Sequence, residues 1–392
     1  MSRTFLLILV FPALLLAQPM EEVRAVWLTT AFGLDWPKSF YKENQKNEIV
    51  KILDALSGAN FNTIMLQIRA RGDLIYPSDK EPWAKSLTNK LGKDPGYDPL
   101  KFIINEAHKR GIEVHAWWNV FKVFGRGLPS ASKPEHVVLK YPSFCKKYSN
   151  EWWIDPGIPQ ARDYLLTVIM EMVRKYNIDG INLDYVRYPG KDFSDEDTYR
   201  KFGGNKYKPD WRRDNITQFV EALYDSIQNV NPVIKLGCAP VGIYKNTENF
   251  SGWEAYNDTF QDPVKWIRDK KLDYISPLTY WKINLPPYYN LVVKNWKRIA
   301  GNRHIYPSVA IFKLSKSEGD WSANEILSEV DVLRKSRTEG TVFFRTGNLL
   351  DNQKNILELI RNNKFQYPAN IPSMPWKDNI KPLPLTGLTS QR

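Results

Sequence analysis

The sequence contains very little cysteine and histidine. Its two cysteines, Cys145 and Cys238, lie far apart in a chain of 392 residues. A large domain with its own core does not need a disulfide, and Cys238 lies in an apolar strand pattern. We therefore interpret Cys238 as a small buried residue, with a disulfide as the less favoured alternative. The four histidines are scattered and no His/Cys cluster has zinc spacing, so we expect no metal and no other cofactor.

Motifs of several enzyme classes are also missing. The sequence has no GxSxG motif, which argues against a serine hydrolase. It has no glycine-rich phosphate loop, because Gly125-Arg126-Gly127 is too short and too isolated to form one. The net charge of +12 favours anionic partners or surfaces, but the basic residues are dispersed and no nucleic-acid motif accompanies them. We expect no nucleic-acid partner.

Residues 1–17 have the pattern of a secretory signal peptide. The basic Arg3 precedes an apolar run that ends at Ala17, after which cleavage is expected. A lipoprotein would carry a cysteine where this chain has Gln18. The sequence therefore predicts a soluble exported protein, periplasmic or secreted, with no stable membrane insertion after the signal is removed.

The mature chain alternates strand patterns with helical patterns. Strands are expected at residues 23–30, 62–69, 112–119, 178–184, 233–240, 272–279, 304–310 and 341–345. Helices are expected at residues 47–59, 100–109, 160–176, 214–230, 263–269, 288–299, 323–337 and 349–362. Eight strand-helix units predict an α/β fold, a (β/α)8 TIM barrel over residues 18–365. A doubly wound open sheet is the alternative, but no glycine fingerprint follows the first strand.

Residues 366–392 form a proline-rich tail that cannot continue the helices. We expect an extended strap on the barrel, anchored by Met374 and Trp376, with residues 385–392 disordered. Four long connections, at residues 70–99, 120–159, 185–213 and 241–262, all follow strands and so leave the C-terminal face of the barrel. Their many tryptophans and tyrosines argue against disorder.

Polar and aromatic residues stand in the inward phase near the strand ends. By alternation they include Trp27, Thr29, Gln67, Arg69, His115, Trp117, Asn119, Asn182, Asp184 and Tyr280. Such groups suit a polyhydroxylated ligand, because sugar rings stack on aromatics while their hydroxyls need directional hydrogen bonds. A tryptophan is more often part of a core than a sugar platform. We interpret Trp27 as core, and Trp117, Trp118 and Trp281 as platform candidates.

The stretch DGINLDYVRYPG, residues 179–190, ends a buried strand with an acid. A buried carboxylate must be paired, for example with Arg187, or serve a function. The end of the fourth barrel strand lies at the floor of a cleft beneath the long loops, which favours a catalytic role for Asp184. Arg187 and Tyr188 then become rim residues near the ligand.

Glycoside hydrolysis normally needs a second carboxyl group. Asp73, Asp35, Asp155 and Glu254 are all expected on the correct rim. Asp35 and Asp155 precede or approach prolines, so we favour turn or capping roles for them. Asp73 is either a salt-bridge member between two arginines or catalytic, and Glu254 is either catalytic or a solvated loop residue.

Several ordered motifs resemble one known family. They are VRAVWLTTAFGLDWP, FNTIMLQIRARGDLIYPSDKEPW, GKDPGYDPLKFIINEAHKRGIEVHAWWN, WWIDPG, DGINLDYVRYP, DWRRDNI, DYISPLTYW and YPANIPSMPW. From about Val23 to Trp376 the chain is similar to the bacterial glycosyl-hydrolase-like family ten. Family members often carry a second Asp where this chain has Tyr185, and a Gln where it has Leu278.

The resemblance implies a TIM barrel, export to the envelope and hydrolysis of a glycan polymer or oligosaccharide. Peptidoglycan strands stripped of their stem peptides are the best single substrate implied. The alternative is a non-catalytic glycan-binding barrel. Our catalytic candidates are Asp184, Asp73 and Glu254. Our substrate-binding candidates are Gln67, Arg69, Arg71, His115, Trp117, Trp118, Asn119, Asn182, Arg187, Tyr188, Tyr280 and Trp281.

Overall fold

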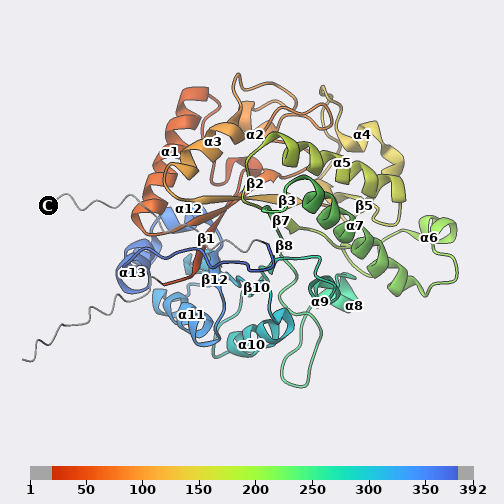
Figure 1. The fold of residues 1–392 in the computed structure, drawn as a ribbon. Coiled ribbons are helices and arrows are strands. Elements are labelled where there is room, and N and C mark those ends of the chain that lie inside the picture. Colours follow the sequence, from red (N-terminus) through yellow and green to blue (C-terminus); the bar gives the residue numbers. More distant parts are fainter. Residues whose placement is uncertain (1–19, 378–392) are drawn as a thin grey trace, which may run out of the picture.

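One parallel sheet curls into a barrel at the centre of the molecule (Figure 1). A computed structural model describes residues 20–377, so the signal peptide expected at residues 1–17 and the end of the tail lie outside the described residues. The strands follow the order β10-β9-β8-β7-β3-β2-β1-β12-β11. Their bounds are β1 Val23–Leu28, β2 Thr63–Arg69, β3 Glu113–Asn119, β7 Gly180–Asp184, β8 Lys235–Cys238, β9 Tyr274–Ile275, β10 His304–Ile305, β11 Ser308–Val309 and β12 Gly340–Phe343.

The seventh barrel strand is split in two, and its halves close the barrel. β10 pairs with β9, whereas β11, three residues further along the chain, pairs with β12 at the other edge of the sheet. Pro307 lies between the halves and has no N–H to donate, although its carbonyl oxygen accepts from Val342 at 3.2 Å. One chain segment thus bonds to both edges, and the predicted eight-unit TIM barrel is confirmed.

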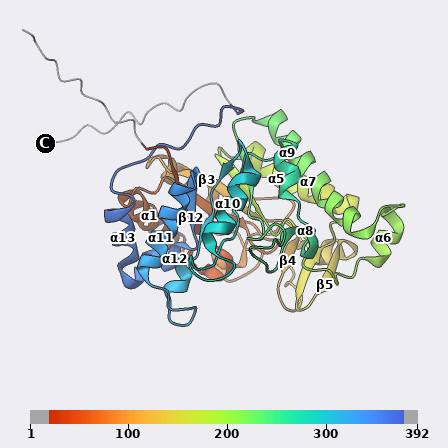
Figure 2. The ribbon, with the colours of Figure 1, turned by 90° about the horizontal axis from the view of Figure 1, so that it is seen from below.

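Helices surround the sheet (Figures 1 and 2). The principal ones are α1 Lys42–Gly58, α3 Pro99–His108, α5 Pro159–Lys175, α7 Lys208–Val230, α9 Pro263–Arg268, α10 Tyr289–Ala300, α11 Ala323–Lys335, α12 Thr346–Leu350 and α13 Ile356–Asn363. The single helix predicted over residues 349–362 was wrong. Asn352, Lys354 and Asn355 have φ between 51° and 57°, and these left-handed residues divide the segment into α12 and α13.

Apolar side chains form two cores, one on each face of the sheet. The larger core lies between the strands and the helices, and both cysteines are buried there and unbonded. The smaller core fills the barrel interior with Trp27, Met65, Trp117, Tyr274, Tyr306 and Met374. Burial of this apolar surface is the main stabilising term of the fold, and it leaves the strand ends rigid enough to position a site.

The long loops are ordered and contain structure that the sequence did not reveal. β4 Lys122–Phe124, β5 Cys145–Tyr148 and β6 Glu151–Ile154 form a separate antiparallel sheet after β3. In both views β5 lies on the same side of the barrel as α6 (Glu196–Phe202). Three other short helices occupy loops: α2 Lys85–Thr88, α4 Val137–Lys140 and α8 Ala255–Asp258. None of the helices between residues 20 and 377 is both long and apolar enough to cross a bilayer.

The proline-rich strap lies on the barrel, as predicted, and it crosses the end where the strands begin. Met374 enters the interior core, and Trp376 donates its indole N–H to Asp273 at 2.9 Å. Residues 378–392, including the segment expected to be disordered, lie outside the described residues.

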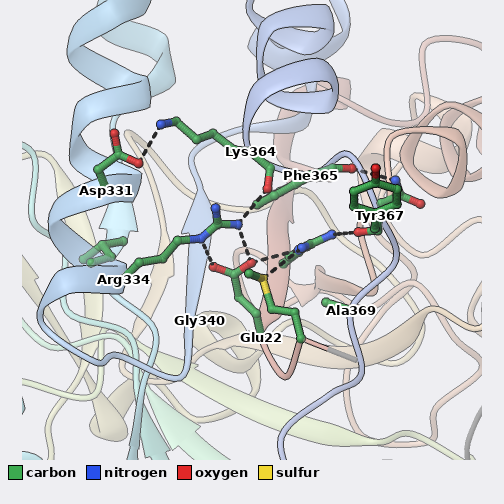
Figure 3. A network of polar contacts seen from close by, with 12 residues as sticks. Glu22, Asp331, Arg334, Gly340, Lys364, Phe365, Tyr367 and Ala369 are labelled. Atoms are coloured by element: carbon green, nitrogen blue, oxygen red, sulfur yellow. Dashed lines mark hydrogen bonds and ion pairs between the residues drawn. The ribbon is translucent and has the colours of Figure 1, made fainter. Parts of the chain in front are cut away.

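A buried ionic network holds the start of β1 to the C-terminal elements (Figure 3). Arg334 of α11 donates two hydrogen bonds to Glu22, both at 2.8 Å, and Arg24 donates a third at 2.9 Å. Arg24 also donates to the carbonyl oxygen of Tyr367 at 2.6 Å, and Arg334 to that of Lys364 at 2.8 Å. The Glu22 carboxylate therefore joins the first strand to α11, and Arg24 joins the same network to the strap.

Candidate active site

A cleft of about 800 Å³ opens at the C-terminal ends of the strands. Its floor comes from inward residues near the ends of β1, β2, β3 and β7, and its walls from the long loops. The residues that line it include Trp27, Gln67, Arg71, Trp117, Asn119, Lys122, Glu151, Asp184, Tyr185, Arg187, Trp253, Leu278, Tyr280, Trp281 and Phe344. The position is the one at which TIM-barrel enzymes build their sites.

Asp184 is the last residue of β7, and its carboxyl group lines the cleft floor. Its Oδ2 accepts a hydrogen bond from Trp117 Nε1 at 3.1 Å, and its Oδ1 accepts one from the backbone N–H of Tyr185 at 2.7 Å. Burial raises the pKa of Asp184, although both hydrogen bonds and the charges of Arg187 and Lys122 oppose the rise. A carboxyl group whose pKa is raised by burial suits a general acid.

The backbone of Tyr185 has a left-handed conformation, with φ of 49°. Tyrosine avoids this region, which costs about 1 kcal/mol or more, and such residues cluster at functional sites. The Tyr185 ring centroid lies 4.9 Å from Lys122 Nζ and 5.1 Å from Arg187 Cζ. At the position where the family resemblance implies a second acid, this chain thus has an aromatic ring flanked by two cations.

Glu151 is the second acidic residue in the cleft lining that the structure describes. It begins β6 and forms an ion pair with Lys122 of the neighbouring strand β4. Its Oε2 also accepts a hydrogen bond from Trp153 Nε1 at 3.3 Å. The small antiparallel sheet therefore brings a carboxylate to the cleft wall from a loop rather than from a barrel strand.

Aromatic rings cover much of the cleft surface. Trp117 packs edge-on against Trp27, with ring centroids 4.9 Å apart, and Tyr280 packs against Phe344 at 5.9 Å. Trp253 on the rim is 51% exposed and is therefore available to a ligand. Flat rings at the floor and the rim can stack on the apolar faces of sugars.

Two amide side chains on the floor have unused hydrogen-bonding groups. The Gln67 Oε1 accepts from the backbone N–H groups of Thr30 and Ala31, which directs its NH2 group elsewhere. Asn119 donates its NH2 to the carbonyl oxygen of Ala70 at 2.8 Å, while its Oδ1 has no partner within residues 20–377. The floor thus offers a donor and an acceptor, the groups that sugar hydroxyls require.

The structure brings eight of the residues predicted from the sequence into this cleft. They are Gln67, Arg71, Trp117, Asn119, Asp184, Arg187, Tyr280 and Trp281. Tyr185 and Leu278, the two positions that the family resemblance singled out, line the cleft as well. Trp27, interpreted as core, is 1% exposed and forms part of the floor.

Arg69 does not point into the cleft, and the expectation of substrate contact there was wrong. A register shift after Gln67 pairs Arg69 with Trp118, whose ring faces the outer core, instead of with Asn119. The bulge reverses the alternation on which the prediction depended. Arg69 is fully buried and donates two hydrogen bonds of 2.6 Å to Glu81.

Four other predicted binding residues lie away from the cleft surface. His115 and Asn182 are buried in the barrel interior, where they bond to Tyr274 and Ser276 respectively. Trp118 is fully buried in the outer core, because neighbouring residues of a strand face opposite sides. Tyr188 is also fully buried in the outer core. The geometry gives none of the four a direct contact with a ligand.

The two other catalytic candidates also lie outside the cleft lining. Asp73 accepts hydrogen bonds from the backbone N–H groups of Arg71 and Lys85 and lines a neighbouring cavity. Glu254 is 3% exposed and accepts from the backbone of Asn246. Their placement favours structural roles.

Asp35 and Asp155, for which the sequence favoured turn or capping roles, also lie outside the cleft lining. Asp35 forms an ion pair with Arg345, and Asp155 accepts from Thr198 and from the backbone of Gly157. Across residues 20–377, no group of three or more His, Cys, Asp or Glu side chains is arranged to hold a metal.

Sequence reasoning missed Glu151, Lys122, Trp253, Phe32 and Phe344 as cleft residues. Glu151 stands in EWWID, where the prediction selected Asp155 instead. The available signal was the alternation of Glu151 and Trp153 within a short strand pattern. This alternation does not show that β6 pairs with β4 and so lies beside Lys122 at the cleft.

The barrel has the same fold as the catalytic domains of several glycosidases of known structure. The glycoside hydrolase domain of PgaB (BpsB) from Bordetella bronchiseptica has a similar fold, with a TM-score of 0.59 and 12% identity over 87% of this chain and 98% of that one. The catalytic domain of beta-amylase from Paenibacillus polymyxa gives a TM-score of 0.58 and 13% identity, over 89% and 99%.

The chain belongs to the family Glycosyl hydrolase-like 10, whose model matches residues 22–321. Glycosyl hydrolase YngK of Bacillus subtilis is 33% identical over 93% of this chain and 76% of its own length. Glycosyl hydrolase DigH of Escherichia coli K12 is 31% identical over 84% of each chain. The protein is therefore a glycoside hydrolase that acts on a glycan.

Proposed function

We propose that the chain is an exported hydrolase of bacterial envelope glycan and that it cleaves peptidoglycan strands stripped of their stem peptides. The observation that carries the catalytic part is Asp184, a carboxyl group with a raised pKa on the floor of a cleft lined with aromatic rings. The pattern of residues 1–17 and the family resemblance support export and the substrate.

Asp184 acts as the general acid in this proposal. Its carboxyl proton passes to the glycosidic oxygen as the bond from that oxygen to the anomeric carbon breaks. Glu151 supplies the second carboxylate, which either takes a proton from the attacking water or forms the glycosyl intermediate that water then opens. Either route consumes one water molecule and releases one new reducing end.

The aromatic rings form the sugar subsites. Trp117 stacks beneath the sugar at the point of cleavage, and the exposed Trp253 holds the chain on the rim. Arg187 lies 4.9 Å from the Trp253 ring centroid and 5.4 Å from that of Trp153, which fixes its guanidinium at the wall.

Release of reducing ends from peptide-free peptidoglycan strands tests the proposal. Asp184→Asn should reduce the rate by at least about 10³-fold, because the general acid is lost. Asp163→Asn, an exposed residue on α5, should leave the rate unchanged. Both variants should have the same midpoint of denaturant unfolding as the wild type. Wild-type release by Asp184→Asn would contradict the assignment, and wild-type activity only on another glycan would contradict the substrate.

Cell fractionation tests export. The full chain should be recovered outside the cytoplasm, and a chain that begins at Gln18 behind a new Met should remain inside it. If the full chain and the shortened chain are found in the same fractions, the prediction of a signal peptide is wrong.

A further inference from the structure

A second cavity adjoins the cleft. It has a volume of about 670 Å³ and shares Ala31, Phe32, Ala70 and Arg71 with the cleft lining. Beyond these residues it is lined by Lys38 and Phe40 after β1, by residues around α2, and by Phe124 and Leu128 after β3. The two hollows therefore adjoin at Arg71.

Arg71 is held firmly at the junction. Its backbone N–H donates to Asp73 Oδ1 at 3.1 Å, and its carbonyl oxygen accepts from His136 Nε2 at 2.7 Å. The next residue, Gly72, has φ of +68°, and a Cβ there would lie 2.7 Å from the same histidine nitrogen. The backbone that carries Arg71 is therefore fixed by contacts on both sides.

The Arg71 guanidinium is stacked but has no counterion. Its Cζ lies 4.4 Å from the ring centroid of Phe32 and 5.0 Å from that of Phe124. Among residues 20–377 it forms no ion pair and no side-chain hydrogen bond, whereas Arg69, two residues earlier, is paired with Glu81. The stacked rings orient the planar group and leave its N–H donors free.

Two lysines add to the positive charge of the second cavity. Lys38 and Lys85 line it, and neither ammonium group forms an ion pair with a carboxylate within residues 20–377. The acid in this lining, Asp73, directs both carboxylate oxygens to backbone N–H groups, at 3.1 and 3.4 Å. The cavity thus presents three cations and no carboxylate paired with them.

We propose that the second cavity binds a carboxylate-bearing sugar of the same glycan that is cleaved at Asp184. Arg71 donates two parallel N–H hydrogen bonds to the carboxylate, because the planar guanidinium group matches the geometry of a carboxylate. Lys38 and Lys85 add electrostatic attraction at longer range. Phe32, 74% exposed, stacks against the sugar ring. This inference rests on the proposed function and identifies the residue that selects the substrate.

A carboxylate site of this kind accounts for the proposed preference for strands without stem peptides. A stem peptide is joined to the sugar through that carboxyl group as an amide, which carries no charge. Removal of the peptide restores the carboxylate, and only then does Arg71 gain a charged partner. In this proposal the second cavity discriminates peptide-free strands from peptide-bearing ones by the charge of that group.

Binding to the inactive Asp184→Asn protein tests this separately from catalysis. The two probes are peptide-free peptidoglycan oligosaccharides and the same oligosaccharides with every carboxyl group converted to a primary amide. Calorimetry should show about tenfold tighter binding of the acidic probe, as expected for a charge-assisted hydrogen bond. Adding Arg71→Gln should abolish the difference, and adding Lys85→Gln should reduce it.

Arg361→Gln on the exposed surface of α13 removes the same charge outside both cavities and should leave the difference intact. Equal affinity for the two probes, no binding of either, or an undiminished preference in the Arg71→Gln protein would each overturn the inference. If Arg71→Gln does not fold, an unchanged preference in the exposed Lys85→Gln variant overturns it. Product release by the wild type, measured apart, decides the proposed function.

Discussion

Trp117 donates its indole N–H to Asp184 at 3.1 Å and so links the ends of β3 and β7. The two strands are parallel neighbours in which Asn119 is paired with Asp184, so Trp117 lies two residues back on the same face. The ring on the cleft floor and the acid beside it are therefore one unit. A change in the ring changes the proton affinity of the acid.

Trp117→Phe should move the pH profile of kcat/KM. The variant keeps a ring but loses a hydrogen bond that favours the ionised form of Asp184, so the pKa of Asp184 rises further. Because a general acid must be protonated, the alkaline limb should move upward by about one pH unit. Trp118→Phe, in the outer core, should not move it. A shift of the acid limb instead would identify Asp184 as a base.

Glu151→Gln should lower kcat by about 10³-fold, since the second carboxylate can no longer act as base or nucleophile. KM should change little, because the shape of the side chain is kept. Steady-state kinetics on peptide-free strands measure both constants.

Glu254→Gln is the matched control for Glu151→Gln. Glu254 lies outside the cleft lining, and the amide retains an acceptor for the backbone of Asn246. Its kcat should equal that of the wild type. If kcat falls more in Glu254→Gln than in Glu151→Gln, Glu254 rather than Glu151 is the second catalytic carboxylate.

Glu22→Gln should destabilise the fold without affecting the cleft. The change leaves Arg24 and Arg334 without their shared carboxylate, and breaking a buried pair of this kind costs about 3 kcal/mol. Urea denaturation measures the free energy of unfolding. Glu358→Gln, exposed on α13, should stay within about 0.5 kcal/mol of the wild type. A similar loss in both variants would show that the network adds nothing specific.

His304 should make the protein less stable in acid. Burial, with the charges of Lys235 and Lys297, lowers the pKa of His304 from 6.5 to about 4. The unfolded chain therefore binds this proton first, so the stability is complete above pH 6.5 and falls as the pH drops toward 4, by about 3 kcal/mol.

The wild type and His304→Gln should be compared by urea denaturation at pH 7.5 and pH 4. The carboxyl groups change the free energy of unfolding equally in both proteins. The difference between the two proteins in the stability lost from pH 7.5 to pH 4 therefore gives the contribution of His304. Parallel loss of stability in the two proteins would exclude this effect.

Regular periodicity explains what the sequence predicted well. The alternating strands and amphipathic helices specify the barrel, because each repeat reports which face is buried. From that register Asp184 could be placed at the inward end of its strand. Asn119 and Gln67 followed by the same rule.

The failures occur where this periodicity stops. Arg69 follows a bulge, and no residue pattern announces the extra residue that turned it outward. Glu151 depends on the pairing of β4 with β6 inside a loop of forty residues, and such pairing is a tertiary contact. Asn182 and His115 do face inward as predicted, but alternation says nothing about depth, and they lie beneath the floor.

The position of the strap also determines where a tag, a solid support or a fused domain can be joined to the chain without covering the cleft. Glu21 pairs with Asn370 at the end of the barrel where the strands begin, whereas Asp184 stands at the end where a strand finishes. Both ends of the described chain therefore leave from the face opposite the cleft. A tag, a solid support or a fused domain joined at either side would leave the mouth of the cleft open to a polymer too large to diffuse.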